Sequence, residues 1–244
     1  MEELTEFPAK MSKSLKNVVN PDDVIRDYGA DSLRLYEMFM GPLQVVKPWQ
    51  TSGVKGVHNF LRRANRLVAE TPAADRAMTP AEAKSLAAMV KKVGGDLETM
   101  DFNTAISAMM VFVNEAEGFA KGTAGGSGDP EPLPREYLEK FVLCLSPFAP
   151  HLGEELWEFL GHEGTLAYEP WPEYDASALV EDEIEIPVQV LGKLRARVRV
   201  PAAADAAAME AAARASADVQ KHLAGKTVVK VICVPKRMVN FVVR

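Results

Sequence analysis

The sequence contains almost no cysteine. Cys144 and Cys233 are the two cysteines among its 244 residues, and neither has a second Cys at the C-x-x-C spacing of a zinc site. This argues against zinc ligation and predicts buried free thiols in a reducing compartment. No histidine stands at metal-ligand spacing from another His or Cys, so no bound metal is expected. The four histidines are His58, His151, His162 and His222.

Long apolar runs are also missing. No segment approaches the roughly 20 apolar residues that cross a bilayer, and the acidic residues 1–6 lack the apolar centre of a signal peptide. We therefore expect a cytoplasmic protein with no membrane partner. The G-x-S-x-G motif of many hydrolases and the glycine-rich loops that cradle phosphates are absent too, so the sequence lends those catalytic classes no support.

Negative charge predominates, but it is unevenly distributed. The chain has 28 Lys and Arg against 34 Asp and Glu, a formal net charge of −6. Residues 193–244 contain eleven Lys and Arg against three Asp and Glu, a net charge of +8, which leaves −14 for the remainder. A basic segment beside an acidic body indicates a polyanion-binding surface in that segment.

Helical periodicity dominates residues 31–160. Apolar residues recur at helical spacing over residues 53–70, and Thr-Pro-Ala-Glu at residues 79–82 has the form of a capping box. We expect the paired glycines 94–95 to interrupt the helix that follows, and Asp31 to cap the helix that begins there. The pattern predicts an all-α bundle.

Helix 53–70 has a cationic side. Arg62, Arg63 and Arg66 share it with Lys55, and no acidic residue of the same segment occurs before Glu70. A surface of this kind is either an ordinary solvated face or a contact for a phosphate backbone. Both interpretations stay open on the sequence of this helix alone.

Period-2 alternation replaces the helical pattern after residue 182 and predicts a small ββαββ domain. The expected elements are strands at 183–190, 194–200, 227–234 and 238–243 and a helix at 205–222. Pro187 suggests that the first strand lies at a sheet edge. Arg195, Arg197 and Arg199 project from one face, because residues two apart on a strand point the same way. The adjoining turns add Lys193, Lys236 and Arg237.

One short segment has a composition suited to phosphate binding. Residues 10–14 read Lys-Met-Ser-Lys-Ser, and we call them the signature loop. Paired lysines beside hydroxyl groups form a plausible polyphosphate clamp. The alternative is a solvated lysine-rich loop, and five residues by themselves do not separate the two interpretations.

The context of the signature loop resembles the second signature of class I aminoacyl-tRNA synthetases. Asn-Val-Val-Asn-Pro follows at residues 17–21, and Tyr-Gly-Ala-Asp-Ser-Leu-Arg at 28–34. One set of further segments narrows the resemblance to bacterial-type leucyl-tRNA synthetases. Two other segments are shared more widely with the isoleucine, valine and methionine enzymes. The narrowing segments are 49–54 with 60–63, 102–106, and 188–195 with 234–235; the shared ones are 147–151 and 154–157. The resemblance covers residues 8–244, with Leu191 at a position that is usually polar in the family.

This resemblance implies the C-terminal portion of a leucine–tRNA ligase with a mainly α fold. Residues 1–40 would be the end of the catalytic domain, 41–178 a helical bundle of the anticodon-binding type, and 183–244 a small α+β domain that binds tRNA. The nucleotide-binding and editing domains of the family have no counterpart in the chain, so we expect it to be inactive alone.

The same resemblance implies a two-step reaction for the full enzyme. Leucine and ATP, with Mg²⁺, would give leucyl-adenylate, and the leucyl group would pass to tRNA-Leu. Lys10 and Lys13 are the expected catalytic residues, and Met11, Ser12 and Ser14 complete the expected ATP-binding loop. The expected tRNA contacts are Arg62, Arg63, Arg66, Lys193, Arg195, Arg197, Arg199, Lys236 and Arg237. We expect a monomer. The alternatives are a stand-alone tRNA-binding module without catalysis and the same region of an isoleucyl-, valyl- or methionyl-tRNA synthetase.

Overall fold

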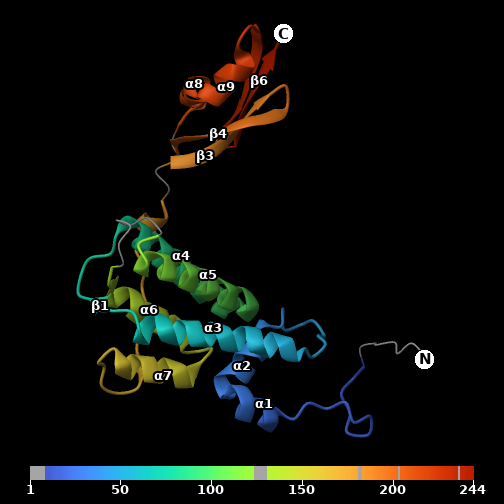
Figure 1. Cartoon of the computed structure of the whole chain (residues 1–244), viewed down its shortest axis with the longest axis vertical. Helices are drawn as coiled ribbons and strands as arrows, with labels where there is room; N and C mark the ends of the chain where they lie inside the picture. Colours follow the sequence, from blue (N-terminus) through green and yellow to red (C-terminus); the bar gives the residue numbers. More distant parts are fainter. Residues whose placement is uncertain (1–8, 124–130, 181–182, 203, 236) are drawn as a thin grey trace. The chain divides into compact units, whose positions relative to one another are not determined.

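The computed structural model divides the chain into two compact units (Figure 1). Unit 1 is Met1–Leu179 and unit 2 is Val180–Arg244. The structure describes residues 9–123, 131–180, 183–202, 204–235 and 237–244. Each unit has its own hydrophobic core, so each is described by itself.

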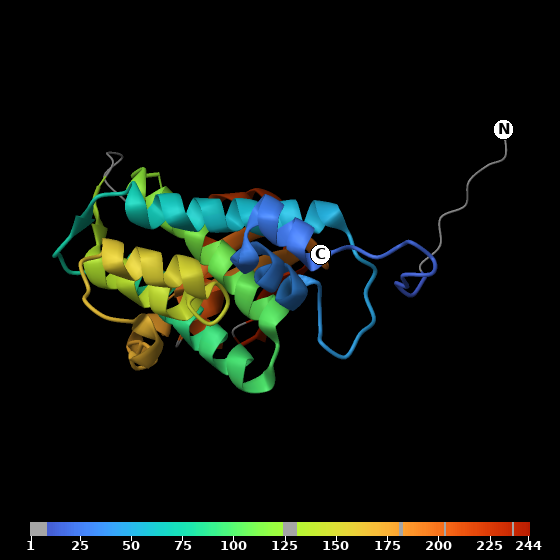
Figure 2. The same ribbon diagram turned by 90° about the horizontal axis from the view of Figure 1, so that it is seen from below.

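Unit 1 is a helical bundle, as the periodicity predicts. Figure 2 shows its longer helices packed side by side, with α3 running along α2 and α7. The helices are α1 (Pro21–Tyr28), α2 (Ala30–Phe39), α3 (Thr51–Ala69), α4 (Pro80–Thr99), α5 (Phe102–Ala120), α6 (Arg135–Leu145) and α7 (Pro150–Phe159). Short 3-10 turns η1 (Leu166–Tyr168) and η2 (Ala176–Leu179) follow, and strands β1 (Ala73–Ala74) and β2 (Leu133–Pro134) form a small parallel ladder.

Aromatic stacking fills the centre of unit 1. Phe112 of α5 stacks on Tyr137 and Phe141 of α6, with ring centroids 4.5 and 5.1 Å apart. All three side chains are fully buried. Each buried aromatic of this size stabilises the fold by about 1.5–3 kcal/mol, so this stack makes a substantial contribution to the core of unit 1.

Two expectations about helix ends are corrected by tertiary contacts. The capping box at Thr79 and Glu82 is present, but α4 runs through Gly94 and Gly95 to Thr99, because packing of its buried face outweighs the low helix propensity of glycine. Asp31 does not cap α2. Its carboxylate accepts from the backbone N–H of Leu152 at 2.8 Å and therefore caps α7 instead.

Gly53 allows α2 and α3 to approach closely at the start of α3. A Cβ atom at this position would lie 2.5 Å from Cε2 of Tyr36. The Tyr36 ring is buried, packs edge-on against Trp49, and its hydroxyl accepts from the N–H of Gln50 at 2.8 Å. The ring is thus held on three sides and cannot move aside cheaply.

Gly53→Ala should therefore destabilise unit 1 by about 1–3 kcal/mol through overpacking. Gly56, one turn further along α3, is the matched control, because a Cβ atom added there would meet nothing within 4 Å. Gly56→Ala should stabilise the helix by about 1 kcal/mol. Urea unfolding of the two variants measures both effects, and equal shifts of the same sign would show that Tyr36 does not constrain position 53.

Unit 2 is the predicted α+β domain. A four-stranded sheet in the order β4-β3-β6-β5 is covered on one face by two short helices. The elements are β3 (Glu183–Val190), β4 (Lys193–Pro201), α8 (Ala206–Ala215), α9 (Ala217–Leu223), β5 (Val228–Val234) and β6 (Met238–Val243). Strands β3 and β6 run parallel and the other pairs antiparallel. The predicted single helix is divided at Ser216, whose extended backbone separates α8 from α9.

The expectation that Pro187 marks an edge strand is wrong. Strand β3 is central, with β4 on one side and β6 on the other. The pairing with β6 begins at Val188 and ends at Val190, so the residue that lacks an N–H group lies just outside that ladder. The sequence shows that Pro187 has no N–H group to donate. It does not show that the pairing of β3 with β6 starts only at Val188.

A tight turn joins β3 to β4. Leu191 and Gly192 both have positive φ angles, 53° and 77°, which is the pattern of a type I′ hairpin turn. Leu191 is exposed, and a polar residue such as Asn tolerates this conformation better than Leu. The turn positions Lys193 at the start of the arginine-bearing strand.

No helix within the described residues is both long and apolar enough to cross a membrane.

Candidate nucleotide and nucleic-acid binding sites

The signature loop lies before α1 with its lysines open to solvent. Lys10 and Lys13 are exposed, and no ion pair joins either of them to another described residue. Ser12 and Ser14 hydrogen bond to each other, Oγ to Oγ, at 2.7 Å. The loop therefore presents two ammonium groups without an ion-pair partner in the described part of the chain, which is what an incoming polyphosphate needs.

Backbone and side-chain hydrogen bonds close the loop on itself. The N–H of Leu15 donates to the carbonyl of Ser12 at 3.1 Å, and that of Lys16 to the carbonyl of Lys13 at 3.2 Å. Asn17 accepts from the N–H of Ser12 at 2.8 Å and donates through Nδ2 to the carbonyl of Lys10 at 3.2 Å. Asn17 is not among the site residues that the sequence predicts.

Met11 connects the signature loop to unit 1 only loosely. Its side chain is 41% exposed and lies at a hollow of about 480 Å³ that is lined mostly by apolar side chains. Val19, Leu33, Met40 and Trp49 are among the others that line it. The expected part of Met11 in ATP binding stays a prediction.

The three arginines of α3 have different surroundings. Arg62 and Arg66 are exposed and line a groove of about 400 Å³ between α2, α3 and α7. Arg63 instead donates to Oε1 of Glu117 at 3.0 Å and to Asn114 at 2.6 Å, both on α5. The hydrogen bond from Arg63 lowers the pKa of Glu117. Arg63 thus joins α3 to α5, and α3 presents fewer free cations than its sequence suggests.

His58 lies in the same groove and did not figure among the predicted site residues. Its Nδ1 is 3.1 Å from Oγ of Ser32 and 3.2 Å from the carbonyl oxygen of Tyr28. The sequence spacing could have identified His58 as a neighbour of Arg62. His58 precedes Arg62 by four residues, and residues four apart share a helix face. The acidic Glu70 and Glu155 also line this groove, so its charge is mixed rather than basic.

Unit 2 carries a row of arginines on the sheet face that the helices leave uncovered. Arg195, Arg197 and Arg199 of β4 are all exposed, and alternate residues of a strand are about 6.6–6.8 Å apart. Arg197 contacts the one acidic side chain paired with the row, with Nη1 3.3 Å from Oε2 of Glu185 on β3. The row as a whole keeps an excess of positive charge.

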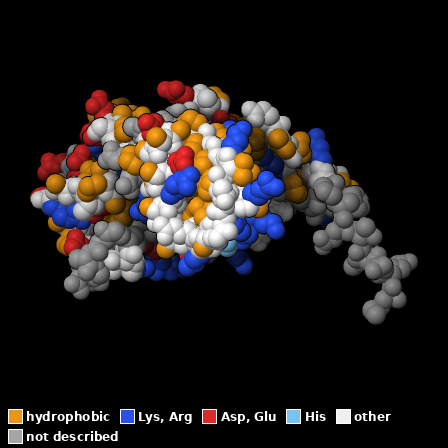
Figure 3. All heavy atoms as spheres, turned by 90° about the horizontal axis from the view of Figure 1, so that it is seen from above, with side chains coloured by type: hydrophobic (Ala, Val, Ile, Leu, Met, Phe, Trp, Pro, Cys, Tyr) orange, Lys and Arg blue, Asp and Glu red, His pale blue; other side chains and the backbone are white. Residues whose placement is uncertain are grey.

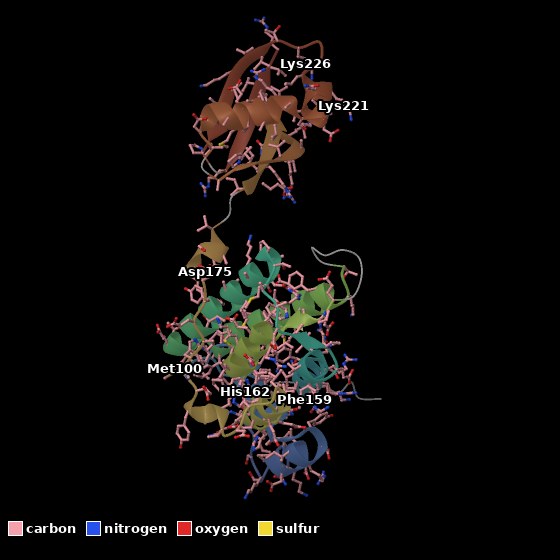
Figure 4. All side chains as sticks on the ribbon, turned by 90° about the vertical axis from the view of Figure 1, so that its left-hand side faces the viewer. Met100, Phe159, His162, Asp175, Lys221 and Lys226 are labelled. Atoms are coloured by element: carbon pink, nitrogen blue, oxygen red, sulfur yellow. The ribbon has the colours of Figure 1, made fainter. Side chains whose placement is uncertain are left out.

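The other predicted contacts of unit 2 come from different elements. Lys193 is exposed as the first residue of β4, and Arg237 is exposed in the turn before β6, whereas Lys236 lies outside the described residues. Lys221, on α9, pairs with Asp218 at 2.8 Å, and Figure 4 shows it near Lys226 at one end of the unit. In the space-filling view of Figure 3, Lys and Arg side chains are prominent on the face shown.

The described residues give little support for catalysis by a bound metal ion or by a nucleophilic thiol. No three His, Cys, Asp or Glu side chains within them are grouped closely enough to hold a metal ion. Burial raises the pKa of the Cys144 and Cys233 thiols, so both are poor nucleophiles at neutral pH. Glu154 accepts from Thr165 and from the N–H of Leu166 and serves to hold η1.

The described residues thus form a helical bundle with a lysine loop before it and a basic α+β unit after it. A family model described as the anticodon-binding domain of tRNA ligase matches residues 83–210, and a model of class I tRNA synthetases (I, L, M and V) matches residues 6–45. The chain belongs to the anticodon-binding family of tRNA ligases.

Its relatives are leucine-specific. The leucine–tRNA ligase of Sorangium cellulosum (strain So ce56) is 50% identical over 98% of this chain and 27% of its own length. That of Rhodopirellula baltica is 47% identical over 96% of this chain and 24% of its length. A crystal structure of an Agrobacterium radiobacter K84 LeuRS–tRNA–LeuAMS ternary complex matches 96% of this chain and 32% of that chain, with a TM-score of 0.72 at 29% identity. The chain thus spans about a quarter of the length of these curated relatives.

Proposed function

We propose that this chain is the part of a leucine–tRNA ligase that binds the tRNA backbone and places a lysine loop against ATP. Similarity to leucine–tRNA ligases over nearly the whole chain supports the assignment. The observation that carries the tRNA-binding role is the exposed row Arg195, Arg197 and Arg199 within a segment of net charge +8. A row of cations at regular spacing along one strand suits successive phosphates of one nucleic-acid strand.

The residues divide between the two steps of the reaction. Lys10 and Lys13 would offset the negative charge that builds on the departing pyrophosphate when leucine and ATP form leucyl-adenylate, with Mg²⁺ neutralising part of the same charge. Arg62 and Arg66 of α3 and the arginine row of unit 2 would hold tRNA-Leu for transfer of the leucyl group. Lys193, Lys236 and Arg237 are further proposed tRNA contacts of the same basic segment.

The proposal has consequences for the organisation of the chain. Residues 1–40 would end the catalytic domain, 41–178 form the bundle against the tRNA, and 183–244 form the second tRNA-binding domain. The isolated chain would bind tRNA as a monomer in the cytoplasm without forming leucyl-adenylate. Absence of ATP–pyrophosphate exchange by the chain alone, together with tRNA binding, is the expected pattern.

Changing Arg195, Arg197 and Arg199 together to Gln should weaken tRNA binding by at least about tenfold at 0.1 M salt, because each lost phosphate contact removes about 0.7–0.9 from the salt slope. Fluorescence titration of tRNA-Leu at several salt concentrations measures both quantities. The slope should fall by about 2 or more.

Two controls isolate the effect of position from that of charge. Changing Lys221 and Lys226 to Gln removes positive charge from the same unit away from β4 and should change the slope little. Glu185→Gln removes the partner of Arg197 and should tighten binding. Unchanged binding by the triple variant, or equal losses in the lysine control, would contradict a tRNA-contacting role for the row.

A further inference from the structure

Asn17 is the residue that closes the signature loop. Its side-chain amide bonds to backbone groups on both sides of Met11, since Oδ1 accepts from the N–H of Ser12 and Nδ2 donates to the carbonyl of Lys10. One side chain therefore fixes the start of the loop, while two backbone turns fix its end. Both amide groups of Asn17 are used within the loop.

A helix-capping role does not account for Asn17. The N-terminus of α1 is capped by Asn20, which accepts from the N–H of Asp22 at 3.2 Å. Asn17 lies three residues before that cap and makes no bond to α1 among those described. Its hydrogen bonds join it to backbone groups earlier in the chain, at Lys10 and Ser12.

The closed loop includes a strained residue. Lys16 has a φ of 55°, a left-handed conformation that costs a non-glycine residue about 1–2 kcal/mol. Such a conformation persists only where the surroundings over-determine it. The backbone turn at Lys16 and the two bonds of Asn17 are the interactions that hold this segment, so loss of Asn17 should open it.

We propose that Asn17 is a positioning residue, which holds the Lys10–Met11–Ser12–Lys13 backbone in one conformation so that the lysine ammonium groups are aligned for a polyphosphate. The inference rests on the proposed function of the loop. Cations that are fixed before the substrate arrives need no reorganisation during the reaction and stabilise developing charge more effectively than mobile ones. Asn17 itself would touch neither ATP nor pyrophosphate.

The first test measures the loop in this chain alone. In Asn17→Ala the Ser12 amide loses its acceptor, and its hydrogen exchange, followed by NMR, should become about tenfold faster. Asn20→Ala is the matched control, because it removes an exposed asparagine of the same segment and should leave Ser12 unchanged. Unchanged Ser12 exchange in Asn17→Ala would overturn the inference whether or not the loop binds ATP.

The second test measures chemistry in a hybrid ligase, in which this chain replaces the matching part of the Sorangium cellulosum enzyme. Asn17→Ala should lower kcat for ATP–pyrophosphate exchange by about tenfold with the KM for leucine unchanged, and Asn20→Ala should stay within twofold of the unmodified hybrid. A faster Ser12 amide with unaltered exchange kinetics would overturn the positioning role. Full activity of Lys13→Ala would instead remove the proposed function of the loop itself.

Discussion

Lys13→Ala in the hybrid ligase is expected to slow leucyl-adenylate formation by about 100-fold or more, the usual effect of removing one preorganised charge-stabilising group. Lys13 is exposed and has no ion-pair partner among the described residues, so its ammonium group is available to the departing pyrophosphate. The attraction between the Lys13 ammonium group and the pyrophosphate would strengthen as the pyrophosphate gains negative charge. The KM for leucine should change little, because leucine itself carries none of that charge.

Pre-steady-state measurement of adenylate formation separates the rate from ground-state binding. Lys55→Ala is the matched control, since Lys55 is an exposed lysine on α3 outside the loop, and its removal should leave the rate within twofold. Lys10→Ala should have a smaller effect than Lys13→Ala. Equal losses in the rate and in leucine binding would argue against a role for Lys13 in the transition state.

Arg76→Met is expected to destabilise unit 1 by about 3–5 kcal/mol, the typical result of leaving one partner of a buried ion pair behind. Arg76 donates from Nη1 and Nη2 to the two carboxylate oxygens of Glu82, at 2.9 and 2.6 Å. The Glu82 side chain is 3% exposed and also accepts from the N–H and hydroxyl of Thr79. Urea unfolding of unit 1 measures the loss.

The pH dependence of this loss follows from the pKa of Glu82. Burial alone would raise it, but the hydrogen bonds from Arg76 and Thr79 outweigh burial, and the folded-state pKa lies below the ordinary value. A lowered pKa contributes stability above the unfolded-state pKa, about 4.3, which is lost as the pH falls through the folded-state value.

The difference between the unmodified chain and Arg76→Met should therefore be largest at pH values above about 4.3 and shrink as the pH falls below that value. Arg26→Met is the control, because Arg26 and its partners Asp23 and Asp27 are exposed, and no measurable change is expected. A difference between the unmodified chain and Arg76→Met that stays constant as the pH falls well below about 4.3 would show that Glu82 does not carry the effect.

Local patterns predicted most elements of the fold. The capping box at Thr79 identified the start of α4 within one residue, and strict alternation identified β3 and β4. Each of these patterns lies within a few consecutive residues, so it can be recognised without knowing which distant residues the segment contacts. The helix of unit 2 was predicted whole because its alanine-rich composition hides the break at Ser216.

Errors arose where a residue acts through a distant partner. Asp31 caps α7 rather than its own helix, since Leu152 is brought beside it by the fold. Gly94 stays helical, and a Cβ there would meet Nε1 of Trp171 at 3.1 Å, a neighbour from a remote segment. Neither of these contacts has a signature in the sequence around the residue.

The candidate sites followed the same rule. The lysines of the signature loop and the arginines of β4 are predicted site residues because residue type and spacing single them out, and their roles stay predictions. Asn17 was missed because its part in the loop depends on the hydrogen bonds that it makes to Ser12 and Lys10. An asparagine has many ordinary uses, and only these contacts distinguish this one.

The salt dependence of tRNA-Leu binding by this chain tests the central claim most directly. If the arginine row and α3 hold the phosphate backbone, the logarithm of the binding constant should fall linearly with the logarithm of salt concentration, with a slope of about −3 or steeper from four or more phosphate contacts. No binding at 50 mM salt, or binding whose strength does not change with salt, would contradict the account.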